Sequence, residues 1–187
     1  MRYEPKKIGK SPEIMCLACF ICAAIMIAAS NIHRLTGVGI MQTIAVGFLV
    51  AMIFIAVRYI FTSFRYEVVK RSKNDDAPVK SLAPESLELR ISRQTGSRGF
   101  ACENIVNLGD IISFEEIPSG KAEKSMLKSA GKGPFYKYKK NMAGGKCWLL
   151  CARGEKENIR IVLEIGDEGI ELSDYLHAVA SFNNNEK

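Results

Sequence analysis

Two long uncharged apolar runs dominate the N-terminal third of the chain. The first extends from Ile14 to Ile32 and the second from Leu35 to Val57, with only His33 and Arg34 between them. As helices they would measure about 28 and 34 Å at about 1.5 Å per residue, and a bilayer hydrocarbon core is about 30 Å thick. A helix also satisfies its own backbone hydrogen bonds without water. The runs therefore predict a transmembrane hairpin over residues 14–58, with buried core helices as the alternative.

Basic residues flank the two runs unevenly. Four Lys or Arg precede the first run, one lies between the runs, and five follow the second run within residues 58–73. Cytoplasmic flanks carry the excess of Lys and Arg, so a multi-pass cell-membrane protein with both termini in the cytoplasm is expected, its first 13 residues forming a tail. A cleaved signal peptide is the alternative, since Ala28-Ala29-Ser30 resembles a cleavage site. The second run alone would still hold the C-terminal region on the cytoplasmic side.

Small side chains recur at every fourth position of the second run. Such a stripe lets helix backbones approach closely in lipid, where no hydrophobic force drives helices together. It predicts either packing against the first run, where Ala24 and Ala28 offer a similar face, or assembly with a second copy. The small-residue stripe consists of Gly39, Thr43, Gly47 and Ala51.

After the second run the pattern changes to an alternation of apolar and polar residues, which is typical of half-buried strands. A cytoplasmic domain over residues 64–187 is expected, with seven strands and a closing amphipathic helix capped by Asp167. A lysine-rich connection over residues 118–134 is expected to contain one or two helical turns, Glu123 to Ala130, without an apolar face. The strands are expected at residues 64–68, 87–91, 99–106, 110–117, 135–140, 146–152 and 159–165.

Glycines mark the expected chain reversals between these strands. Gly96 is expected to form the turn between the second and third strands, so that the first four strands make a meander. The pair Gly144-Gly145 is interpreted as a hairpin turn between the fifth and sixth strands, because it lacks the spacing and the Ser or Thr of a phosphate-binding loop. Residues 72–84 are polar, contain two prolines and are expected to be a loop.

The order of two spans, four strands, three strands and a terminal helix resembles the bacterial membrane-anchored pleckstrin-homology-like (PH-like) proteins. That resemblance implies a mainly-β, α+β domain, a seven-stranded, partly open barrel of two orthogonally packed sheets with a helix closing one end. Related modules bind phosphoinositides, peptides or partner domains. The resemblance supplies no functional residue. It lies in Phe64-Arg65-Tyr66-Glu67-Val68, Leu87-Glu88-Leu89-Arg90-Ile91, Gly96 and Leu108-Gly109-Asp110-Ile111-Ile112.

Charge is distributed unevenly along the 187 residues, whose net charge is +6. Eight lysines and one glutamate lie between residues 121 and 146. A basic group of this kind can dock on anionic lipid headgroups or on an acidic protein partner, and no nucleic-acid motif accompanies it. A solvated run that protects a strand edge is the alternative. The candidate binding residues are Lys121, Lys124, Lys128, Lys132, Tyr136, Lys137, Tyr138, Lys139 and Lys140.

Catalytic and metal-binding patterns are weak. His33 and His177 fall at the outer membrane edge and on the terminal helix, so they cannot share a site. Three of the six cysteines, Cys16, Cys19 and Cys22, lie in the first apolar run, where thiolate ligands would be costly. Cys147 and Cys151 are expected on one strand face in the core, and Cys102 stays unplaced.

Two functions are compatible with these patterns, and neither requires a cofactor or a metal. The first is a non-catalytic, cytoplasmic PH-like module that binds an anionic lipid surface or a protein partner from a membrane anchor. The second is a small structural subunit of a larger membrane complex, assembled through the small-residue stripe. An enzyme is not expected, because no convergent set of catalytic side chains is evident.

Overall fold

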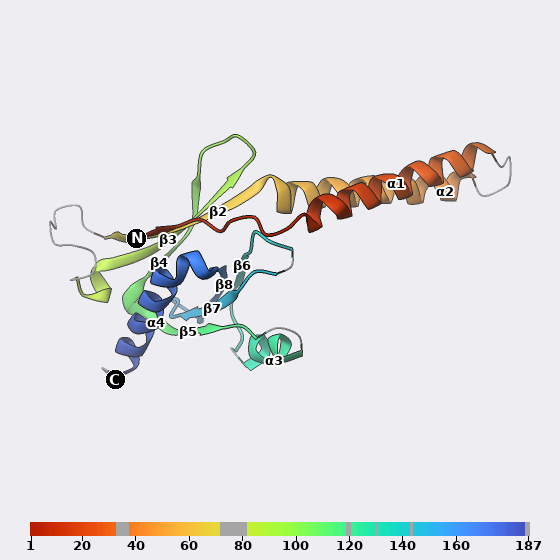
Figure 1. Ribbon diagram of the computed structural model, residues 1–187. Coiled ribbons are helices and arrows are strands. Elements are labelled where there is room, and N and C mark those ends of the chain that lie inside the picture. The colour runs from red at the N-terminus through yellow and green to blue at the C-terminus, as the bar shows by residue number, and fades with distance from the viewer. Residues whose placement is uncertain (33–37, 72–81, 119–120, 130, 143, 186–187) are drawn as a thin grey trace. The chain divides into compact units, whose positions relative to one another are not determined.

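The computed structural model describes residues 1–32, 38–71, 82–118, 121–129, 131–142 and 144–185. The chain divides into two compact units (Figure 1). The first unit, the helical hairpin, comprises Ile8–Thr62. The second, the sheet domain, combines Met1–Lys7 with Ser63–Lys187. Two stretches that are far apart in the sequence therefore fold together.

The helical hairpin consists of α1 (Ser11–Ile32) and α2 (Val38–Ile55), which a π-helical turn extends over Ala56–Ile60. The two helices lie side by side (Figure 1). Small residues at their contact, Ala23 and Ala45, are each only 1% exposed, which allows the close backbone approach typical of helices in lipid. The turn predicted around residues 33–37 lies outside the described residues.

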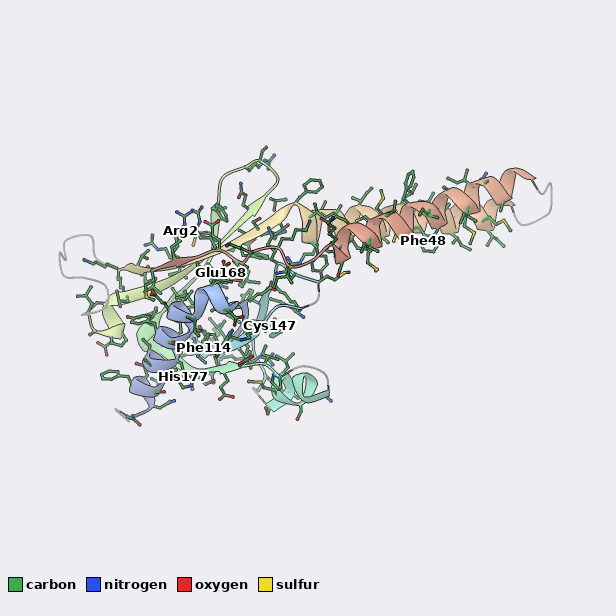
Figure 2. The ribbon with its side chains drawn as sticks, viewed as in Figure 1. Arg2, Phe48, Phe114, Cys147, Glu168 and His177 are labelled. Carbon is green, nitrogen blue, oxygen red and sulfur yellow. The ribbon has the colours of Figure 1, made fainter. Side chains whose placement is uncertain are left out.

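Large apolar side chains project outward around both helices (Figure 2). Phe54, for example, is 68% exposed. The stretches Ser11–Ser30 and Gly39–Ile60, of 20 and 22 residues, are long and apolar enough to cross a membrane by length and composition. A soluble protein would bury such faces, because contiguous apolar surface in water favours association. The helices therefore indicate membrane association.

The first sheet of the sheet domain has the strand order β1-β2-β3-β4. Three of its strands occupy predicted positions, and the predicted turn at Gly96, with φ of 66°, joins β3 to β4. The N-terminal strand differs from the prediction, which gives residues 1–13 as a tail without a strand. It pairs antiparallel with β2, Tyr3 lying opposite Tyr66. The strands are β1 (Arg2–Tyr3), β2 (Thr62–Lys70), β3 (Leu87–Thr95) and β4 (Ala101–Asn107).

The second sheet has the order β5-β7-β8-β6, with β6 parallel to β8. Two predictions about connections are therefore wrong. The first four predicted strands do not form a meander, since β5 belongs to the second sheet. Gly144-Gly145 is not a hairpin turn, because the crossover from β6 to β7 passes the end of β8. The strands are β5 (Ile111–Glu116), β6 (Phe135–Tyr138), β7 (Cys147–Ala152) and β8 (Ile159–Glu164).

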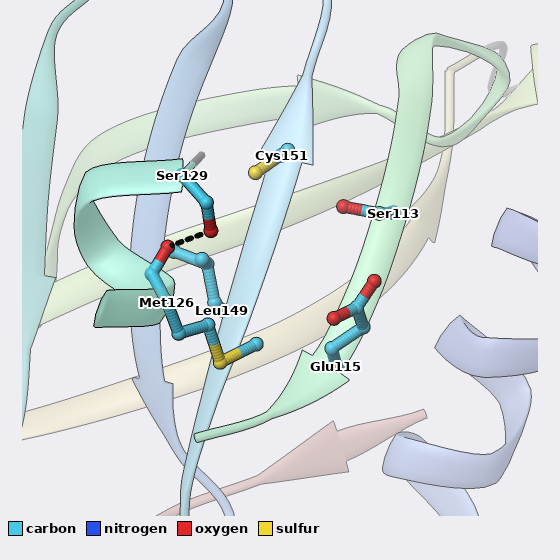
Figure 3. A pocket seen from close by; sticks show the side chains of 6 residues that line it. All are labelled: Ser113, Glu115, Met126, Ser129, Leu149 and Cys151. Carbon is cyan, nitrogen blue, oxygen red and sulfur yellow. Dashed lines mark hydrogen bonds between the residues drawn. The ribbon is translucent and has the colours of Figure 1, made fainter. Parts of the chain in front are cut away.

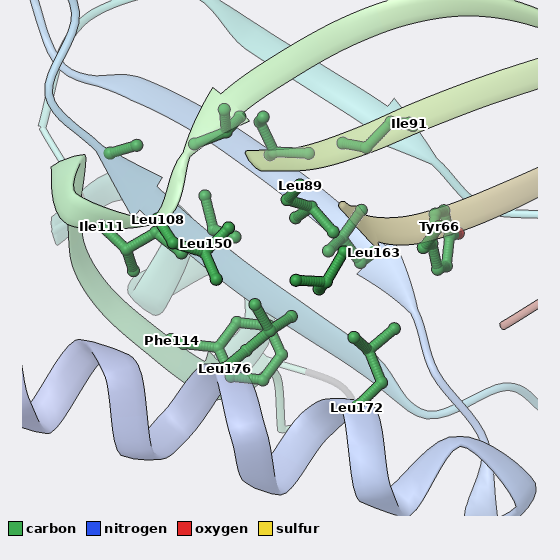
Figure 4. Packing of buried hydrophobic residues seen from close by; sticks show 14 of the residues in the cluster. Tyr66, Leu89, Ile91, Leu108, Ile111, Phe114, Leu150, Leu163, Leu172 and Leu176 are labelled. Carbon is green, nitrogen blue, oxygen red and sulfur yellow. The ribbon is translucent and has the colours of Figure 1, made fainter. Parts of the chain in front are cut away.

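The main core lies between the inner faces of the two sheets and the closing helix α4 (Ile170–Asn185). Leu172 and Leu176 of α4 point toward the buried residues Phe114 and Leu150 (Figure 4). The chain is thus α+β with two apolar helices, as predicted. Among the described residues, the strands form two four-stranded sheets and no closed barrel.

The start of α4 differs from the prediction. Asp167 is not its N-cap, because a 3-10 turn, Asp167–Gly169, precedes the helix, and Gly166 occupies the N-cap position of that turn without a side-chain cap. The Asp167 carboxylate instead accepts a hydrogen bond from Lys146 Nζ at 2.6 Å. This ion pair raises the pKa of Lys146. The Asp167 side chain therefore pairs with Lys146, which is distant in the sequence, and does not cap the helix.

Helix α3 (Lys121–Ser129) covers the outer face of the second sheet. Met126 and Leu127 pack there against a second apolar cluster, so the prediction that this helix lacks an apolar face is wrong. Arg160 of β8 holds the helix end by donating hydrogen bonds to Leu127 O at 3.2 Å and Gly133 O at 2.8 Å. The second cluster consists of Leu149, Cys151 and Val162, with Cys147 packed against it on the same strand face, as predicted.

Tyr66 connects the two sheets through its buried hydroxyl. The hydroxyl donates to Tyr138 O at 2.7 Å and accepts from Glu164 N at 3.3 Å. Burial raises the pKa of Tyr66 well above its ordinary value, so the hydroxyl stays protonated and can donate. A strand of the first sheet is in this way hydrogen-bonded to two strands of the second.

We expect Tyr66→Phe to lower the free energy of unfolding by about 1–3 kcal/mol, because it leaves buried polar groups without their partner. The measurement is denaturant unfolding of the full chain in detergent, followed by fluorescence of Trp148, the single tryptophan, which stacks on Phe114 at 5.0 Å. Tyr175→Phe, on the half-buried face of α4, is the matched control. Equal effects of the two changes would contradict the role given to Tyr66.

Candidate functional site

The predicted lysine group is divided between two parts of the sheet domain. Lys128 and Lys132 are exposed in and after α3, over the outer face of the second sheet. Lys139 and Lys140 lie instead in the crossover from β6 to β7 and are half-buried. Lys137 is exposed on β6 between these two sets. Lys121 and Lys124 begin α3, but their side chains lie outside the described part.

The two tyrosines of this group have different surroundings. Tyr136 is 41% exposed, whereas Tyr138 is 6% exposed and belongs to the main core. The Tyr138 ring meets Phe64 edge-on at 5.6 Å, and its hydroxyl accepts a hydrogen bond from Asn104 Nδ2 at 3.2 Å. Strand alternation puts both rings on one face of β6, where they stack at 6.4 Å, so the difference comes from position along the strand: Tyr138 ends β6 and packs in the core. Tyr138 is therefore not a surface binding residue.

A buried carboxylate organises the crossover that carries Lys139 and Lys140. Glu164, at the end of β8, is 2% exposed. Its Oε2 accepts hydrogen bonds from the backbone N–H groups of Lys140 at 2.6 Å and Asn141 at 2.8 Å. Its Oε1 accepts one from Asn141 Nδ2 at 2.8 Å. Hydrogen bonds to an ionised acceptor are about twice as strong as neutral ones, so this set, the Glu164 clamp, offsets the cost of burying the carboxylate.

Gly145 is required by the Glu164 clamp. A Cβ atom at this position would overlap the Glu164 carboxylate. The backbone of the crossover can approach the carboxylate only because residue 145 lacks a side chain. The glycine pair that resembles a hairpin turn in the sequence thus serves a close packing contact.

The crossover also holds both points at which the chain leaves the sheet domain. Asn141 Nδ2 donates to Lys6 O at 2.8 Å, next to the end of the Met1–Lys7 segment. Lys140 Nζ donates to Ser63 Oγ at 2.6 Å, at the start of the second segment. We call this crossover the exit loop. Burial and the nearby charge of Lys7 lower the pKa of Lys140, so basic groups crowd this point.

The N-terminal segment is fastened along its length. Arg2 and Arg65 both bind Glu4, at 2.6 and 2.8 Å, and the hydrogen bond from Arg2 is the main reason that the pKa of Glu4 is lowered. The Tyr3 hydroxyl accepts a hydrogen bond from Gly166 N at 2.9 Å. Strand β1 is therefore an integrated part of the sheet domain, despite its two residues.

A pocket of about 220 Å³ lies between α3 and the outer face of the second sheet (Figure 3). Burial raises the pKa of the Cys151 thiol in its wall, which disfavours the nucleophilic thiolate. The lining includes no histidine to act as its base. It consists of Ser113, Glu115, Met126, Ser129, Leu149 and Cys151.

Metal-binding and histidine chemistry find little support in the part of the chain that the structure describes. No group of three or more His, Cys, Asp or Glu side chains there could hold a metal ion. His177 is exposed on α4 (Figure 2), and His33 lies outside the described residues.

The small-residue stripe of α2 does not pack against α1. Gly39, Thr43, Gly47 and Ala51 are all exposed. Added Cβ atoms at the two glycines would meet nothing within 4 Å. The alternative of packing against the first run through Ala24 and Ala28 is wrong, since these alanines are exposed and Ala23 makes the contact instead. The stripe is therefore available to another helix.

No protein-family model, curated protein or solved structure matches this chain. The function of the chain is therefore inferred from its own geometry. The lysine run in the sequence indicates Lys139 and Lys140, but nothing in that run indicates their connection to Lys7, Ser63 and Glu164. A carboxylate at the end of an apolar strand, at Glu164, was the one available signal.

We expect Glu164→Gln to lower the free energy of unfolding by about 2–3 kcal/mol, because an amide cannot replace an ionised acceptor of three hydrogen bonds. Denaturant unfolding in detergent, read by Trp148 fluorescence, measures the loss. Glu168→Gln removes an exposed ion pair with Lys6 and should change stability by less than about 1 kcal/mol. A Glu164→Gln effect no larger than this control would refute the clamp.

Proposed function

We propose that this protein is a two-span membrane protein whose sheet domain is a non-catalytic binding module at the cytoplasmic membrane surface. Its helices would cross the membrane as a hairpin, and the module would recognise an acidic surface, either anionic lipid or a protein partner. The proposal includes the PH-like character of the domain, which two sheets and a closing helix support. It requires no cofactor.

One observation carries this proposal. The segments before and after the helical hairpin, Met1–Lys7 and Ser63–Lys187, form a single folded unit. A folded unit of this kind cannot be divided across a bilayer, so the intervening residues must return to the side from which they left. Two apolar helices satisfy that requirement, whereas a single span does not. Cleavage after Ser30 would remove β1 from its sheet, which argues against the signal-peptide alternative.

Basic residues are in excess around the two exits, the points after Lys7 and before Ser63 at which the chain leaves the sheet domain. This excess supports a cytoplasmic location of the sheet domain. Flanking Lys and Arg favour retention on that side of the membrane. Several of these residues also have structural partners, since Arg2 and Arg65 bind Glu4, and Lys6 binds Glu168 at 2.7 Å. Positive charge at the exits therefore supports both the orientation and the fold.

We expect a reporter fused after Lys187 to show cytoplasmic location, and a reporter inserted between Ile32 and Val38 to show the opposite side. The full chain should also stay in the membrane fraction after alkaline carbonate extraction. Both ends of the hairpin should lie on one side because both exits belong to one unit, and the flanking Lys and Arg favour the cytoplasm as that side. An exported C-terminal reporter, or a chain released by carbonate, would refute the proposal.

A second candidate function is a structural subunit of a larger membrane complex. The exposure of the small-residue stripe favours it, since such a face permits close helix approach in lipid. The stripe would then bind a second copy of α2 or a helix of another subunit. Both functions can hold for one protein, because they use different units of the chain.

We expect Gly47→Ile to disrupt any oligomer or complex without unfolding the hairpin, since a side chain there meets no other atom of the chain within 4 Å at its Cβ. Size analysis of the detergent-extracted protein measures the effect. Gly47→Ala keeps the stripe small and is the matched control. A complex that survives Gly47→Ile unchanged would exclude the stripe as the assembly face.

A further inference from the structure

Three lysines gather where the chain leaves the sheet domain. Lys139 and Lys140 belong to the exit loop, and Lys7 ends the N-terminal segment beside it. Two hydrogen bonds, from Lys140 Nζ to Ser63 Oγ and from Asn141 Nδ2 to Lys6 O, hold both exits at this loop. These lysines come from positions more than a hundred residues apart, and the fold brings them together.

Chain length limits how far this group can lie from the ends of the helices. Lys7 precedes Ser11, the first residue of α1, by four residues, and Ser63 follows Ile60 by three. Extended chain reaches at most about 3.6 Å per residue, so these connections span no more than roughly 14 and 11 Å. This limit is set by covalent connectivity and holds for any orientation of the sheet domain.

The same limit places the lysines within electrostatic reach of a bilayer. The headgroup layer on one side of the hydrocarbon core is roughly 5–8 Å thick. The exit loop of a membrane-inserted chain therefore lies within about one Debye length, roughly 8–10 Å, of the headgroup surface. Lysine charges at that range are attracted to anionic lipids.

We infer that Lys7, Lys139 and Lys140 form a face that binds anionic phospholipid headgroups of the membrane in which the helical hairpin sits. This inference rests on the proposed function and names its ligand. The side-chain type fits such a surface, because Lys ammonium groups are hydrated point charges, whereas specific phosphate pockets favour the bidentate fork of Arg. The nearby guanidinium groups of Arg2 and Arg65 bind Glu4 instead.

The other lysines of the basic group provide an internal comparison. Lys128 and Lys132 are exposed on the α3 side, as Lys7 is beside the exit loop, whereas Lys139 is half-buried. No short connection to a membrane-spanning helix ties Lys128 and Lys132 to the membrane. The side-chain charge is the same in the two sets, and their place along the chain relative to the helical hairpin differs. A lipid-binding face at the exits predicts different behaviour for the two sets.

The test uses the full chain in nanodiscs of phosphatidylcholine, with or without about one third phosphatidylglycerol, and an amine-acetylating reagent read by mass spectrometry. Acetylation of Lys7 and Lys139 should slow roughly five-fold in the anionic discs. Rates at Lys128 and Lys132 should stay the same. High salt should remove the difference, because it shortens the Debye length to about 3 Å at 1 M.

Charge reversal provides the second arm. Lys7→Glu should abolish the anionic-lipid protection of Lys139, whereas Lys128→Glu should retain it. Both variants change the net charge equally. Trp148 fluorescence checks that each variant stays folded. If a variant unfolds, the acetylation rates of Lys7 and Lys139 in the unmutated chain still test the inference.

Equal acetylation of Lys7 and Lys139 in the two kinds of disc would overturn the inference. Protection of Lys128 and Lys132 instead would also overturn it, since the lipid-facing side would then be α3. Protection that arises in both discs only when a soluble protein fraction is added would assign the face to a protein partner. Failure of the chain to enter nanodiscs would instead refute the proposed membrane anchor.

Discussion

The buried Glu164 carboxylate is the interaction on which the arrangement of the sheet domain depends. An ionised group in a protein interior is costly unless hydrogen bonds compensate it, and here three N–H donors of Lys140 and Asn141 do so. Those donors fix the exit loop, which in turn holds Lys6 and Ser63. The Glu164 side chain therefore determines the path of the exit loop and the position of the two points, near Lys6 and Ser63, at which the chain leaves the sheet domain.

Local periodicity predicted most of the strands, but it could not predict their connections. Alternating burial at Phe64, Tyr66 and Val68 and the turn at Gly96 follow from neighbouring residues alone. Strand β1 is too short to show a period, and it is stabilised by pairing with residues more than sixty positions away. The crossover past β8 was missed for a similar reason, since the contact between Gly145 and Glu164 is invisible in a pattern that otherwise predicts a hairpin.

The candidate site was predictable in composition and unpredictable in geometry. A run of lysines is visible in the sequence, yet the fold separates Lys128 from Lys139 and places Lys7 beside Lys140. Tyr138 shows the same limitation, because an aromatic residue among lysines fits a binding surface and a core strand equally well until strand pairing is known. Charge density along a chain therefore identifies a basic region, and long-range hydrogen bonds decide which of its residues share a face.

The helical hairpin can be understood as the connection between two antiparallel strands, β1 and β2. A two-residue strand has little stability of its own, and closing a long flexible loop between partners costs conformational entropy that grows with its length. Packed antiparallel helices remove most of that cost, because α1 and α2 return the chain to the end where it began. The close packing of the two helices, in which Ala23 and Ala45 are buried, therefore lowers the entropy cost of pairing β1 with β2, although neither residue belongs to the sheet.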